Sequence, residues 1–442
     1  MQNHKSIALA AIAGAMMVPH AAMARTHEQA PSVEQQLKTA QQQIAELQAQ
    51  LDALKARMDQ TAAAQSQVAA DTKVASQKAD QALAQASTAQ TTAVAAQSKA
   101  EVASDKASKP VLADAVKWAA DTKVSGRMYF NVSSVSADDE NGNNVEKDGG
   151  FQIKRFYVGI DHKFNNTLSG NITTDVRQIG GVGQTLFIKK AFLQARFSKA
   201  AIVRLGSADM PWIPYVEGVY GYRHIENTIT DLDHEGNSAD WGVHVMGSLA
   251  NGIVNYQVSA VNGAGYRNPQ FTKTIDLEGR VSVAYKGIQA AVGGYTGKLG
   301  KDVQGGYAPH TASRFDALLG YKGKAGNVGY SIGGEYFFAK NWTHVNTVES
   351  DAAEGYSIFA SVQPAPKWSV FGRYDWVQPN KHLNPIQKDR YFNAGIQFSP
   401  AKIVDLALVY KRDNADGMLQ IGNLGAGQAT RDEIGLYGQF RW

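Results

Sequence analysis

The chain has 442 residues, no cysteine and a net charge of +4, and its mean hydropathy is −0.30. The lack of cysteine excludes disulfides and thiolate metal sites, and the small net charge does not indicate a nucleic-acid partner. No run after the N-terminus is long and apolar enough for a transmembrane helix, which excludes a helical membrane protein but not a β-barrel, whose strands are only half apolar.

The first 24 residues are typical of a secretory signal peptide. Lys5 opens a short apolar run, 7–18, and Ala22-Met23-Ala24 supplies small residues for cleavage after Ala24. The apolar run is too short for a membrane anchor.

Residues 25–120 are rich in alanine and glutamine, and apolar side chains recur at alternating steps of three and four, as in a heptad seam. The seam begins with Leu37, Ala40, Ile44, Leu47, Leu51, Leu54 and Met58 and continues mainly as alanine to Ala107. This pattern predicts a helical coiled coil in the periplasm that ends at Pro110. The alternative interpretation is a low-complexity linker, and contact of the rod with peptidoglycan is a further expectation.

From Thr122 onward, two-residue alternation replaces the heptad, and short and long connections follow one another. Sixteen such segments predict an all-β transmembrane barrel of 16 antiparallel strands over 121–442, with both ends in the periplasm, in the outer membrane of a Gram-negative bacterium. Aromatic residues near the ends of most segments form two girdles that face lipid, which a soluble sandwich or propeller does not explain. The expected strands are 124–132, 154–162, 168–176, 190–197, 201–207, 241–249, 254–260, 275–285, 288–296, 315–321, 328–338, 356–362, 368–376, 392–398, 404–410 and 432–442.

The last segment ends the chain on an aromatic residue. Its outward parity predicts a lipid-facing assembly signal for the barrel-assembly machinery, formed by Ile434, Leu436, Phe440 and Trp442.

A barrel of this size leaves an aqueous channel, so the inward side chains decide what passes. The parity of each strand predicts basic pore-lining residues at Arg127, Arg155, Arg177, Lys190, Arg196, Arg204, Arg280 and Arg373. Because arginine forks onto oxyanions, the cluster of Arg127, Arg155, Arg196 and Arg204 favours an anion bias. The alternative is that many of these charges pair across the wall. The longest stretch without strand character, 209–237, supplies constriction-loop candidates at Asp209, Glu217, Arg223, Glu226, Asp231 and Asp233.

The region 122–442 resembles the phosphate-selective porin O/P family of outer-membrane porins. The similar motifs are 151–159 (FQIKRFYVG), 190–195 (KAFLQA), 204–206 leading to Met210-Pro211-Trp212, 240–243 (DWGV) and 256–263 (YQVSAVNG). The resemblance implies a homotrimer, a third loop folded into the lumen and diffusion of small anions. That family's loop carries lysines, whereas the loop here is acidic and faces an arginine-rich wall, as in a general porin.

No enzyme, metal or cofactor is expected. His244 and Ser248 share a face but lie too far apart to bond along one strand, and no acid stands beside them. The run Asp231-x-Asp233-x-Glu235-Gly236 matches the first half of a calcium loop, but its twelfth position is Gly242 instead of glutamate. The competing hypothesis is a structural one, in which the barrel anchors a rod that tethers the envelope.

Overall fold

The computed structural model describes residues 110–179, 183–417 and 419–442, together with isolated positions between 38 and 94. The chain divides into two units, Met1–Ser108 and Lys109–Trp442. The described positions of the first unit are helical and exposed, while the predicted signal peptide lies outside the described residues. No described helix is long and apolar enough to cross a membrane.

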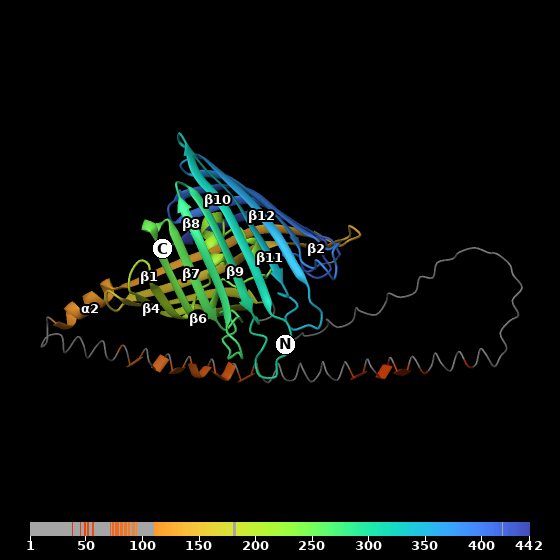
Figure 1. Ribbon diagram of the computed structural model, residues 1–442, viewed down its shortest axis with the longest axis horizontal. Coiled ribbons are helices and arrows are strands. Elements are labelled where there is room, and N and C mark those ends of the chain that lie inside the picture. The colour runs from red at the N-terminus through yellow and green to blue at the C-terminus, as the bar shows by residue number, and fades with distance from the viewer. Residues whose placement is uncertain are drawn as a thin grey trace, which may run out of the picture. The chain divides into compact units, whose positions relative to one another are not determined.

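The second unit is a closed barrel of sixteen antiparallel strands in sequence order, in which β1 pairs with β16 (Figure 1). Helix α2 (Pro110–Ala120) leads into β1. The strands are β1 (Thr122–Asp138), β2 (Asn144–Lys163), β3 (Leu168–Ile179), β4 (Gly183–Arg196), β5 (Ile202–Asp209), β6 (Ala239–Leu249), β7 (Val254–Val261), β8 (Asp276–Tyr285), β9 (Ile288–Gly297), β10 (Ala312–Ala325), β11 (Val328–Lys340), β12 (Ala352–Ala365), β13 (Trp368–Gln378), β14 (Asp389–Ala401), β15 (Val404–Ala415) and β16 (Thr430–Arg441).

The prediction of a 16-stranded antiparallel barrel is confirmed, but several strands are longer than the sequence indicated. The stretch 136–150, expected as a polar loop, is mostly strand, because β1 and β2 stay paired up to Asp138 and Asn144. Alternation of apolar and polar side chains reveals only the part of a strand with an apolar outer face. Ladder hydrogen bonds continue beyond that part with polar side chains on both faces.

Short turns lie at one end of the barrel, and all the long loops lie at the other, where β1–β2 and β3–β4 are also joined by short connections. The turn between β8 and β9 has positive φ at Lys286 (47°) and Gly287 (88°), as a two-residue hairpin that follows the strand twist requires. The turn between β2 and β3 is held by the Asn165 side chain, whose Oδ1 accepts the backbone N–H groups of Thr167 and Leu168, both at 2.8 Å.

The barrel closes on its last residue. Trp442 exchanges both backbone hydrogen bonds with Gly126, each 3.1 Å long. Its ring lies 1.9 Å from where a Cβ of Gly126 would be, and it packs on Phe156 and Phe440. Ile434, Leu436, Phe440 and Trp442 are all on the exposed outer face, while their role as an assembly signal stays a prediction.

The connection between β5 and β6, residues 210–238, contains α3 (Ile213–Tyr220) and α4 (Ile229–Leu232); we call it the inner loop. Its apolar side chains pack against inward-facing residues of the barrel wall on strands that are far from β5 and β6 in sequence. Trp212 packs with Ala291 and Leu318, and Ile225 packs with Phe371 and Tyr437. These partners belong to β9, β10, β13 and β16, so the inner loop folds into the lumen and covers that part of the wall.

Candidate functional site: the lumen and its constriction

Basic side chains of the wall hold the backbone of the inner loop. Arg280 donates from Nε to the carbonyl of Pro211 at 2.7 Å, Arg373 donates to that of Asn227, and Arg314 to that of Glu235. The loop carbonyls have no strand neighbour inside the barrel, and buried carbonyls need a partner. Charge-assisted donors satisfy them more strongly than neutral ones do.

The carboxylates beside these arginines complete the attachment of the loop. Glu335 accepts the indole N–H of Trp212 at 2.7 Å and the hydroxyl of Thr230 at 3.1 Å. Glu278 accepts the backbone N–H of Trp212 at 2.9 Å. The guanidinium of Arg314 is itself bound by Asp316 at 2.7 Å. The wall therefore provides hydrogen-bond partners for both the donors and the acceptors of the loop.

Glu226 anchors the middle of the inner loop between two lysines. Its carboxylate lies 2.9 Å from Lys411 Nζ and 4.0 Å from Lys154 Nζ, and both lysines also donate to the carbonyl of Ile225. Burial raises the pKa of Glu226, but the two ammonium groups outweigh burial and hold it below its ordinary value.

In two other groups of the loop, His224 and Glu235, burial outweighs the neighbouring charges. Burial lowers the pKa of His224 to about 4, and both ring nitrogens are buried without a hydrogen-bond partner. Burial also raises the pKa of Glu235 to about 8, against the opposing influence of Arg314. At neutral pH we therefore expect an uncharged His224 and a largely protonated Glu235.

On the side of the lumen that faces β1–β5 and β16, a cavity of roughly 610 Å³ lies between the wall and the loop; we take it as the candidate constriction and call it the constriction. From the loop, Arg223 and Glu217 face it, paired at 2.5 Å. The wall presents Arg127, which donates to Tyr129 Oη at 3.2 Å, and Arg204, which donates to Gln194 at 2.9 Å.

Toward the long-loop end, the constriction opens into an outer cavity of roughly 650 Å³. Arg223 lines both cavities and also binds Asp231 of the loop at 3.2 Å. Arg155 faces the outer cavity, where it pairs with Asp175 at 2.7 Å. Arg223 therefore stands at the junction between the two spaces.

A third cavity of roughly 510 Å³ lies on the other side of the inner loop, near the short turns of β9–β14. Together the three cavities are lined by six lysines, six arginines and five carboxylates. The cations are Lys154, Lys189, Lys190, Lys322, Lys324, Lys367, Arg127, Arg155, Arg204, Arg223, Arg267 and Arg441, and the carboxylates are Asp161, Asp209, Glu217, Glu226 and Asp231.

The predicted basic residues occupy different places in the structure. Arg127, Arg155, Lys190 and Arg204 line the open cavities, with Lys190 3.1 Å from Asp209, and Arg196 is exposed near the short-turn end of β4. Arg280 and Arg373 lie under the inner loop. Arg177 belongs to β3, but its side chain is outside the described part. Asp233, one of the loop candidates, is buried.

The sequence pattern missed Lys154 and Lys189, which also face the lumen. Each is the extra residue of a β-bulge. Tyr129 pairs with Arg155 and Phe130 with Ile153, which leaves Lys154 unpaired, and Lys189 is skipped in the same way between β3 and β4. A bulge puts neighbouring residues on the same side, which strict alternation cannot predict. The adjacent cations Lys154-Arg155 and Lys189-Lys190 are the available signal.

His244 and Asp231, which belong to the patterns considered for a hydrolase and a calcium loop, have other partners in the structure. His244 contacts Ser259 at 2.8 Å and not Ser248. Asp231 of the calcium-like run is engaged by Arg223. Among the described residues, no group of three or more His, Cys, Asp or Glu side chains could hold a metal ion.

The fold is that of a sixteen-stranded outer-membrane porin. No protein-family model and no curated protein matches the sequence. Among solved structures, it is similar to an anion-selective porin from Comamonas acidovorans, with 14% identity, a TM-score of 0.55 and coverage of 73% of this chain and 99% of that one. OprB of Pseudomonas putida has 11% identity, a TM-score of 0.54 and coverage of 73% and 94%. OmpF of Salmonella typhi has 13% identity, a TM-score of 0.51 and coverage of 72% and 97%. Identities this low establish the fold alone.

Proposed function

We propose that the protein is an outer-membrane porin, a water-filled channel for passive diffusion of small hydrophilic solutes with a bias toward anions. The observation that supports the bias is the excess of cations in the lumen, twelve against five carboxylates along the three cavities. The Comamonas structure, similar in fold, carries the description anion-selective.

The constriction is where the bias has its largest effect. Six cations, including Arg127, Lys189 and Arg204, face three carboxylates there. Two of those carboxylates, Glu217 and Asp209, are already paired with cations. Charges in a narrow space with low-dielectric walls concentrate ions of the opposite sign. Since the planar guanidinium of arginine binds two oxygens of a phosphate or a carboxylate through a fork of N–H groups, phosphate-like oxyanions are the solutes we favour.

Planar-bilayer recordings under a KCl gradient test this function. We expect a reversal potential with the sign of an anion-selective channel, and a smaller potential for the variant Arg127→Gln/Lys189→Gln/Arg204→Gln. The matched control is Lys163→Gln/Lys199→Gln/Lys402→Gln, which removes the same charge from exposed positions that do not line the three cavities. A cation-selective wild-type channel contradicts the proposal.

We also propose the assembly and placement that belong to such a channel: a homotrimer in the outer membrane, with the N-terminal region in the periplasm. OmpT of Vibrio cholerae, a structure described as a trimer form, supports the first point with a TM-score of 0.50 and 13% identity. Light scattering of the detergent-solubilised protein, corrected for bound detergent, tests it; a monomer mass contradicts it.

An envelope tether is the second candidate function, and it is compatible with the first. It is favoured by the helical state of the described positions between 38 and 94, which agrees with the heptad pattern. We propose that 25–109 forms a coiled coil that contacts peptidoglycan. Deletion of 25–109 should leave conductance intact and release the protein from sedimented cell wall, whereas unchanged co-sedimentation contradicts the tether.

A further inference from the structure

The cavity on the far side of the inner loop differs from the constriction in its chemistry. We infer that it is a separate binding site for a polyhydroxylated anion, that is, a sugar carrying a phosphate or a carboxylate. This inference deepens the proposed function and rests on it, because it names a solute class for one part of the same lumen.

The charge of this cavity has a single sign. Lys322, Lys324 and Lys367 line it, and no carboxylate is among the described residues of its wall. Within the described part of the chain these lysines form no ion pair, whereas Lys190 and Arg223 in the constriction are both paired. An anion that enters this cavity therefore meets three uncommitted ammonium groups, each a compact charge with three donors.

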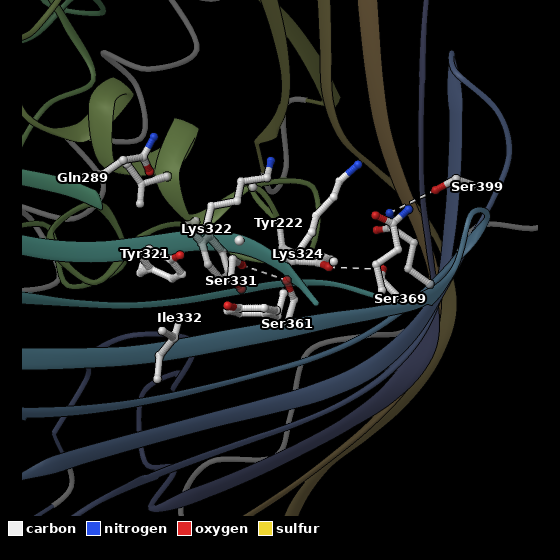
Figure 2. Close-up of a pocket in the computed structure, with 18 of the residues that line it drawn as sticks. Tyr222, Gln289, Tyr321, Lys322, Lys324, Ser331, Ile332, Ser361, Ser369 and Ser399 are labelled. Carbon is white, nitrogen blue, oxygen red and sulfur yellow. Dashed lines mark hydrogen bonds between the residues drawn. The ribbon is translucent and has the colours of Figure 1, made fainter. Parts of the chain in front are cut away.

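Hydroxyl and amide groups form the rest of the polar lining. Ser331 and Ser361 bond to each other at 2.9 Å across β11 and β12, and Ser369 accepts the Tyr222 hydroxyl at 3.1 Å. Figure 2 shows Lys322 and Lys324 extending from β10 on the side of the inner loop, with Ser331 and Ser361 on the neighbouring strands. A serine hydroxyl both donates and accepts, which matches the hydroxyl groups of a sugar.

The size of the cavity agrees with an organic anion and exceeds what an inorganic one needs. Its volume is roughly 510 Å³, within the range of about 300–1,000 Å³ that is usual for small-molecule sites. Residues 218–222 of the inner loop form one side of it. Arg280 and Arg373 of the wall hold the loop at Pro211 and Asn227, before and after this segment in the sequence, so the loop side of the cavity is fixed in place.

The test is block of single-channel chloride current by glucose 6-phosphate, inorganic phosphate and glucose, each added to one side at a time. We expect glucose 6-phosphate to block more strongly from the short-turn side than from the other, and glucose not to block. Lys322→Gln/Lys324→Gln/Lys367→Gln should raise its half-blocking concentration at least five-fold. The Lys163→Gln/Lys199→Gln/Lys402→Gln variant should leave that concentration unchanged.

A second pair of variants separates a sugar site from a plain phosphate site. Ser331→Ala/Ser361→Ala should weaken block by glucose 6-phosphate at least two-fold and leave block by inorganic phosphate unchanged. Equal block from both sides, or a lysine variant indistinguishable from its control, overturns the inference. Reversal potentials recorded on the same channels keep the two proposals apart. An anion-selective channel without the site refutes only the inference, whereas a cation-selective channel refutes the proposed function.

Discussion

The attachment of the inner loop should depend on Arg373, because this arginine neutralises the buried carboxylate of Asp375. As whole residues, Arg373 is 2% exposed and Asp375 is 1% exposed. The guanidinium binds Asp375 and the carbonyl of Asn227 and lies 5.0 Å from the ring centre of Tyr220. Arg373→Met leaves Asp375 as a buried, unpaired charge, and breaking such a pair from one side costs about 3–5 kcal/mol.

Hydrogen exchange of peptides that cover 222–232 measures this cost locally. At about 1.4 kcal/mol per tenfold change, Arg373→Met should speed their exchange by about two to four orders of magnitude. The double variant Arg373→Met/Asp375→Leu also removes the stranded carboxylate, so most of the protection should return, because replacing a whole buried pair by apolar groups is often close to neutral. If these peptides exchange as fast in the double variant as in the single one, the unpaired charge of Asp375 is not what releases the loop.

Three further predictions test the frame of the barrel and the pH response of the loop. Leu436→Arg places a charge on the outer face half-way along β16 and should destabilise the folded barrel by about 2–4 kcal/mol. Urea titrations in lipid vesicles measure this loss, and Gln363→Arg, on the lumen side, should change the stability little. Equal losses of stability in the two variants contradict the assigned faces. Gly126→Val should displace the Trp442 ring that occupies its Cβ position and slow refolding into vesicles; refolding at the wild-type rate contradicts the described closure. The raised pKa of Glu235 means that the packed loop holds a proton which the released loop loses above its ordinary pKa of 4.5, so loop stability should fall from pH 4.5 to about 8. Burial also raises the pKa of Asp233 in the same loop, so Glu235→Gln should weaken this trend in hydrogen exchange at pH 5 and pH 9 without abolishing it. An undiminished trend in the variant refutes the assignment to Glu235.

The barrel could be predicted from the sequence because its physical cause is local. Lipid outside and water inside force each strand to alternate, and this alternation is visible in single segments such as β16. The ends of strands were less predictable. Asp138 and Asn144 extend β1 and β2 into water, where neither face of a strand has to be apolar.

The interior was harder to predict because it depends on contacts between distant segments. Nothing local distinguishes Arg373, which lies beneath the inner loop, from Arg204, which lines the open constriction. Only the path of the inner loop decides which wall it covers. Lys154 and Lys189 escaped prediction because a bulge changes the parity of one residue, and the sequence has no strong marker for it.

The measurement that tests the central claim most directly is the reversal potential of the refolded wild-type channel in a planar bilayer under a KCl gradient. Twelve cations against five carboxylates along the described cavities predict a potential with the sign of chloride selectivity, and a further decrease in current when phosphate is added. A potential with the sign of potassium selectivity would contradict the account, because the excess positive charge of the lumen would then not control the ions that pass.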